Sequence, residues 1–145
     1  MTRADAFVNF TFAVSLLVPC VAFYSFRLPR ETHRKVQAVL LCVAWAAVLV
    51  LETRIRLEGG SGSFIAQSAP GLQRLARVVL GIHITGAVLS YSAWTALVVV
   101  SWRRFRKRLP GDFSARHRIF GRLIFYGLCF DAVSASAMYG LVFVA

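Results

Sequence analysis

Acidic side chains are scarce in this sequence of 145 residues, which holds 6 Asp and Glu against 17 Lys and Arg. A soluble domain with a net charge of +11 would spread that charge among polar residues, but 58% of this chain is hydrophobic and its apolar runs alternate with short basic clusters. Insertion into a membrane explains both properties, because basic residues beside apolar spans set topology and contact anionic lipid headgroups. We therefore expect the lipid bilayer as a partner and discard nucleic acid.

Cysteine is also rare, and common catalytic motifs are missing from the sequence. Cys20, Cys42 and Cys129 lie inside apolar runs without C-x-x-C spacing, so neither a disulfide framework nor a thiolate metal site is indicated. The sequence has no Gly-rich phosphate loop, no H-E-x-x-H and no G-x-S-x-G. These absences argue against a hydrolase or an ATP-driven machine and favour a protein that is not an enzyme.

Four apolar segments are long enough to cross a bilayer, which takes about 20 helical residues. They cover residues 6–26, 33–52, 72–102 and 117–143, and a Gly- and Ser-containing connection follows the second. We expect Thr32 and Ser114 to cap the second and fourth helices and Pro70 to stand early in the third. The sequence thus predicts an all-α, up-down bundle of four transmembrane helices, with residues 1–145 forming a single membrane domain.

Basic residues concentrate in two of the connections and predict the orientation of the bundle. The positive-inside rule places both connections in the cytoplasm, so both termini are expected to be external in a multi-pass protein of the bacterial inner (cytoplasmic) membrane. The residues concerned are Arg27, Arg30, Arg34 and Lys35 in the first connection, and Arg103, Arg104, Arg106, Lys107, Arg108, Arg116 and Arg118 in the third.

Ionisable groups inside membrane spans are costly, so each is a hypothesis of function. His33 and His117 begin the second and fourth spans and should lie at one depth on the cytoplasmic side. Together they could ligate a haem iron or a copper ion. The competing interpretation, which spacing alone favours, is that both are interfacial histidines near lipid phosphates.

A second polar layer is expected nearer the external side, where Glu52 and His83 share a depth and Asp131 lies somewhat deeper. A carboxylate at Glu52 could orient the His83 imidazole or share a metal with it, and the alternative is an interhelical hydrogen bond. Asp131 needs a partner in this setting, for which His83, Tyr91, Tyr139 and Asn9 are candidates. Glu52, His83 and Asp131 are thus the candidate metal ligands of this layer.

The order of these residues resembles the CtaM/YozB-like family of small four-helix membrane proteins. The resemblance implies a histidine-rich bundle linked to the maturation of haem-copper oxidases, with histidines that handle haem or copper. The fourth characteristic histidine of the family is expected near the outer end of the second span, where this chain has Glu52. The resemblance is carried by Asn9, His33-Arg34-Lys35, His83 and Arg116-His117-Arg118-Ile119, in which His33, His83 and His117 match three of the four family histidines.

Three functions remain open from the sequence. The first is an assembly or accessory protein that holds haem or copper for a respiratory oxidase, whose subunit would be its membrane partner. The second is a small b-type cytochrome or a metal-dependent membrane redox protein. The third is a structural subunit of a larger membrane complex, which small-residue spacings such as Ala132-x-x-x-Ser136-x-x-x-Gly140 also suit.

Overall fold

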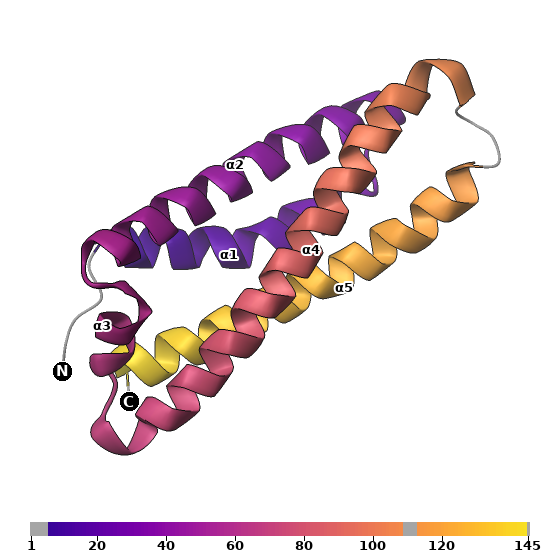
Figure 1. The fold of residues 1–145 in the computed structure, drawn as a ribbon. Coiled ribbons are helices and arrows are strands. Elements are labelled where there is room, and N and C mark those ends of the chain that lie inside the picture. The colour runs from indigo at the N-terminus through magenta and orange to yellow at the C-terminus, as the bar shows by residue number, and fades with distance from the viewer. Residues whose placement is uncertain (1–5, 109–112, 145) are drawn as a thin grey trace.

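The computed structural model describes residues 6–108 and 113–144, except for the side chains of 105–108. Four helices in it are long and apolar enough to cross a membrane, namely Ala6–Ser25, Arg30–Leu57, Pro70–Arg104 and Phe113–Val144. The all-α architecture of a multi-pass membrane protein is therefore confirmed. The elements are α1 (Ala6–Ser25), α2 (Arg30–Leu57), α3 (Gly60–Ala66), the 3-10 turn η1 (Pro70–Leu72), α4 (Gln73–Arg108), α5 (Phe113–Tyr139) and the π-helical turn η2 (Gly140–Val144) (Figure 1). Of the basic residues noted above, the side chains of Arg106, Lys107 and Arg108 lie outside the described part.

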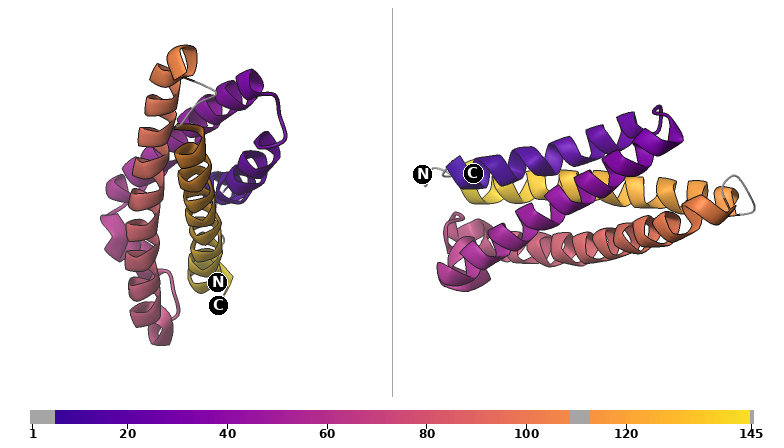
Figure 2. Two further views of the ribbon diagram at one scale, coloured as in Figure 1. Left: turned by 90° about the vertical axis from the view of Figure 1, so that its right-hand side faces the viewer. Right: turned by 90° about the horizontal axis from the view of Figure 1, so that it is seen from above.

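The four long helices form a ring of neighbours in which α1 contacts α2 and α5, and α4 contacts α2 and α5. The α4–α5 contact is the most extensive. α1 begins and η2 ends at the end of the bundle where α3 lies, which we call the α3 end (Figures 1 and 2). The opposite end carries the α1–α2 turn, the last turns of α4 and the first turns of α5, and we call it the basic end.

Two of the expected helix starts are wrong and one is confirmed. The Pro29 carbonyl accepts the His33 backbone N–H at 2.8 Å, so α2 begins at Arg30 and Thr32 lies inside its first turn instead of capping it. Ser114 likewise lies within α5, which begins at Phe113. Pro70 occupies the first position of η1, directly before α4, where its missing N–H and fixed φ are tolerated.

α2 extends past its predicted end, and the connection after it is partly helical. The ion pairs Arg56–Glu52 and Arg54–Glu58 join residues four apart and support these polar turns of α2. Gly59 then adopts a left-handed conformation with φ of 102°, as is common just after a helix. The short helix α3 follows and buries Ile65, so the expected Gly- and Ser-containing connection has a folded part.

The apolar core lies between the four long helices, and much of the remaining apolar surface faces outward. Buried side chains from all four helices meet in one cluster, consisting of Val18, Ala22, Leu41, Ala44, Trp94, Ile124 and Leu128. Large apolar side chains such as Leu17, Leu89 and Leu123 are more than half exposed on the outer faces. Such outer faces suit contact with lipid, where helix association depends on close packing between helices.

Small residues bring α4 and α5 close together toward the α3 end. A Cβ atom added at Gly86 would lie 2.6 Å from the Phe130 ring and 3.2 Å from the Asp131 carboxylate. A Cβ atom added at Gly127 would lie 2.5 Å from the Ser90 hydroxyl oxygen. This close contact fixes the position of α4 relative to α5, and therefore the relative positions of the candidate site residues on these two helices.

Candidate functional site

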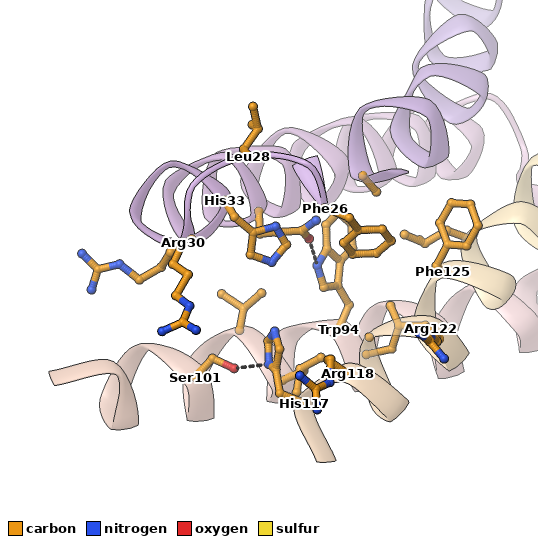
Figure 3. A pocket seen from close by; sticks show the side chains of 18 of the residues that line it. Phe26, Leu28, Arg30, His33, Trp94, Ser101, His117, Arg118, Arg122 and Phe125 are labelled. Carbon is orange, nitrogen blue, oxygen red and sulfur yellow. Dashed lines mark hydrogen bonds between the residues drawn. The ribbon is translucent and has the colours of Figure 1, made fainter. Parts of the chain in front are cut away.

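The structure brings His33 and His117 together at the basic end. Their ring centroids are 6.3 Å apart and their ring planes are nearly perpendicular, at 87°. His33 stands in the first turn of α2 and His117 near the start of α5, and the two rings point toward each other across a pocket (Figure 3). The predicted inner pair is therefore a spatial pair.

The His33 ring is held by the end of α1. Its Nδ1 lies 3.0 Å from the backbone carbonyl oxygen of Ser25 and 3.2 Å from the Ser25 hydroxyl. Because a carbonyl oxygen only accepts hydrogen bonds, we assign the proton to Nδ1. The lone pair of the neutral ring then lies on Nε2, the nitrogen that remains free to bind a ligand.

A chain of hydrogen bonds fixes Ser25, whose side chain is fully buried. The Ser25 hydroxyl donates to the Ala22 carbonyl at 2.7 Å and accepts from Gln37 Nε2 at 2.7 Å. Gln37 Oε1 in turn accepts from Trp94 Nε1 at 2.8 Å. The position of the His33 ring therefore depends on contacts among α1, α2 and α4.

His117 is held in a comparable way by α4. Its Nδ1 lies 2.9 Å from the Ser101 hydroxyl oxygen, and the Phe113 ring lies 6.1 Å away, centroid to centroid. A hydrogen bond of this kind to one imidazole nitrogen is typical of histidines that bind a metal through the other nitrogen. Both histidines of the pair have this arrangement.

The pocket between the histidines has a volume of about 540 Å³, within the roughly 300–1,000 Å³ usual for small-molecule and cofactor sites. One face of each contributing helix lines it, because its residues recur at helical spacing. The lining residues are Ala22, Phe26 and Leu28 around the end of α1; Arg30, His33, Arg34 and Gln37 of α2; Trp94, Leu97, Val98 and Ser101 of α4; and Ser114, His117, Arg118, Gly121, Arg122, Ile124, Phe125 and Leu128 of α5.

The separation of 6.3 Å between the two ring centroids is short enough for both imidazoles to reach one metal ion, since a metal–nitrogen bond is about 2.0 Å long. Imidazole nitrogen is a suitable ligand for both iron and copper. The apolar walls of the pocket also suit the body of a haem.

The outer candidates do not converge in this way. His83 Nδ1 lies 2.8 Å from the hydroxyl oxygen of Ser134, which itself donates to the carbonyls of Phe130 and Asp131. Glu52 is half exposed and accepts from Arg56 Nε at 2.6 Å. Across the described residues, no group of three or more His, Cys, Asp and Glu side chains is arranged to hold a metal ion.

Asp131 is buried against α4, with 7% of its surface exposed. Neither oxygen of its carboxylate has a hydrogen-bond partner in the part of the chain that the structure describes. Three of its expected partners are otherwise engaged, since the Tyr139 hydroxyl donates to Asn9 Oδ1 at 2.6 Å and His83 contacts Ser134. The fourth, Tyr91, packs its ring against Trp45 and Trp94.

Sequence reasoning missed the residues that orient the inner pair, namely Ser25, Gln37, Trp94 and Ser101. One signal was available, because Gln37 is a polar residue four positions after His33 in a span that is otherwise apolar. The two serines carried no comparable signal, since serine is common in membrane helices and also bonds to its own backbone. Their role depends on which helices become neighbours.

No protein-family model matches this chain, and no significant match was found among curated proteins or solved structures. The function is therefore inferred from the residues and their geometry.

Proposed function

We propose that this protein is an accessory or assembly protein of a respiratory haem-copper oxidase and holds haem or copper between His33 and His117. The observation that supports the ligand is the facing pair of imidazoles, each with its Nδ1 engaged by a neighbouring helix. The link to an oxidase rests on the resemblance of the sequence to the CtaM/YozB-like family. An oxidase subunit in the bacterial inner membrane is the proposed partner.

The residues of the site have separate parts in binding. Because the His33 Nδ1 contacts the Ser25 carbonyl oxygen, Nε2 is the nitrogen that His33 would present to a metal. Ser25 and Ser101 hold the two rings, and the apolar residues of the pocket would contact the body of the ligand. When bound, haem or copper would supply one-electron redox chemistry or be passed on to the oxidase.

We also propose that the basic end of the bundle faces the cytoplasm and that both termini are external. The basic residues around the α1–α2 turn and the start of α5 support this orientation. In a bacterial host, alkaline phosphatase fused after residue 145 should be active, and a fluorescent reporter that folds only in the cytoplasm should stay dark there. The opposite pair of results would reverse the assignment of the two ends.

The ligand proposal is tested on protein purified from membranes in mild detergent, by absorption spectroscopy and metal analysis. We expect a haem Soret band or bound copper that is lost in the variants His33→Ala and His117→Ala. The signal should be retained in the matched control His83→Ala, which lies in the half of the bundle toward the α3 end. We call this half the outer half and the half toward the basic end the inner half. Occupancy below one per chain fits an assembly protein, whereas full and tightly held occupancy would identify a small b-type cytochrome. A ligand unaffected by either inner substitution would refute the site, and protein that binds neither haem nor copper would favour a structural subunit.

A further inference from the structure

The pocket between the histidines is strongly positive on one side. Four arginines line it, Arg30 and Arg34 from α2 and Arg118 and Arg122 from α5, and none of its lining residues is acidic. The two arginines of each pair are spaced by one helical turn, so they lie on the same face of their helix, and all four line the pocket that also contains the two histidines. Arginines therefore accompany the histidine on both walls of the site.

These arginines differ in how far they are already engaged. Arg34 pairs with Glu31 at 2.6 Å and stacks on the Trp102 ring at 4.3 Å. Arg118 and Arg122 make no ion pair with any described residue, and both line the pocket. Arg118 lies next to His117, and Arg122 lies farther along α5, toward Phe125 (Figure 3). The charge on the α5 side is thus available to a ligand.

The remaining walls are apolar. Trp94, Leu97, Ile124, Phe125 and Leu128 line the side toward the middle of the bundle, and three of them belong to its buried core cluster. The pocket consequently combines metal-binding nitrogens, an apolar wall and guanidinium groups. A bare copper ion would use only the nitrogens and would be repelled by the arginines.

We infer that the pocket selects a tetrapyrrole that carries carboxylate groups, with His33 and His117 at the metal and Arg118 and Arg122 at the carboxylates. This inference rests on the proposed function and narrows its ligand from haem or copper to haem. Guanidinium groups bind carboxylates through paired, charge-assisted hydrogen bonds, which gives the arginines a specific task beyond their attraction to lipid headgroups.

The test compares three probes on the purified protein in a non-ionic detergent: iron protoporphyrin IX, its dimethyl ester, and Cu(I). Affinities come from the Soret absorbance for the two porphyrins and from a competing chromophoric chelator for copper. The test variant carries Arg118→Gln and Arg122→Gln together. Arg116→Gln is the matched control, because Arg116 is an exposed residue of the same helix that does not line the pocket.

We expect the double variant to bind the free acid about 10-fold or more weakly than the unmodified protein, since it loses charge-assisted hydrogen bonds. The dimethyl ester, which has no free carboxylates, should bind the unmodified protein about as weakly as the double variant binds the free acid. Its affinity for the double variant should equal its affinity for the unmodified protein. Arg116→Gln should leave both affinities unchanged.

Equal binding of the acid and the ester to the unmodified protein would overturn the inference, and that comparison requires no variant to fold. An unchanged affinity of the double variant for the acid would also overturn it and would assign the arginines to lipid headgroups. Copper that binds through His33 and His117 without any haem binding would overturn this inference and leave the proposed function standing. If none of the three probes bound, or if binding did not depend on His33 and His117, both this inference and the proposed function would be refuted.

Discussion

At the basic end of the bundle, His33 and His117 approach to 6.3 Å between ring centroids beside a pocket of about 540 Å³. Toward the α3 end, His83, Glu52 and Asp131 are as conspicuous in the sequence but are dispersed in space. Each outer residue has a separate local setting: a serine for His83, an arginine one turn away for Glu52, and a close helix contact for Asp131.

The difference shows that convergence, and not the number of polar residues, distinguishes a candidate site in a membrane bundle. In the outer half, Gly86 lets α4 and α5 approach closely at Phe130 and Asp131. In the inner half, residues from all four long helices surround a cavity. The comparison therefore favours the inner half for the proposed ligand and identifies helix packing in the outer half.

The largest effect on the outer half is expected from Gly86→Ala. The new methyl group would meet the Phe130 ring at 2.6 Å, and overpacking of this kind costs about 1–3 kcal/mol. Gly81→Ala on the same helix is the control, because its Cβ would meet nothing within 4 Å, and replacing a helical glycine by alanine there should gain about 0.5–1 kcal/mol. Thermal unfolding in detergent measures both, and equal behaviour of the two variants would contradict the close α4–α5 contact.

The two halves are compared directly by removing the serine that holds each histidine. Ser101→Ala takes away the partner of His117 Nδ1, and loss of such a partner should weaken ligand binding about 10-fold to 100-fold. Ser134→Ala does the same to His83 and should leave the ligand affinity unchanged. The ligand affinities of the two variants are measured by titration with the ligand, followed by absorbance. A larger loss of affinity in Ser134→Ala than in Ser101→Ala would place the site in the outer half.

A smaller effect is expected from Asp131→Asn. An amide of nearly the same shape should cost less to bury than a carboxylate that has no hydrogen-bond partner among the described residues. The variant should therefore keep or raise its unfolding temperature in detergent and bind the inner ligand normally. A clear loss of thermal stability would mean that Asp131 has a partner in the membrane, such as a bound cation.

The smallest effect is expected from Glu52→Gln. The ion pair with Arg56 is exposed and joins residues four apart, so its removal should cost about 0.3–0.5 kcal/mol. Metal content and haem spectrum should not change. If this variant lost bound metal, Glu52 would be a metal ligand after all.

The sequence was sufficient for the helices and for the common depth of His33 and His117, but less so for the helix boundaries and for the contacts that hold the two rings. Long apolar runs can hardly form anything but helices in a bilayer, because every backbone polar group must be satisfied within the segment. The start of α2 was misplaced because the Pro29 carbonyl begins the helix before the expected Thr32 cap. Ser25 could not be recognised from the sequence, because it holds the His33 ring only where α1, α2 and α4 meet in the folded bundle.

The central claim is that His33 and His117 bind one ligand together, and a double-substitution cycle on ligand affinity tests it most directly. Affinities are measured for His33→Ala, His117→Ala and the double variant, with His83→Ala combined with each as the outer-half reference. If both imidazoles serve one metal, each single substitution should abolish most of the binding and the double variant should be little worse, which is strong non-additivity. Additive effects of the two inner substitutions, or ligand retained by the double variant, would contradict the account.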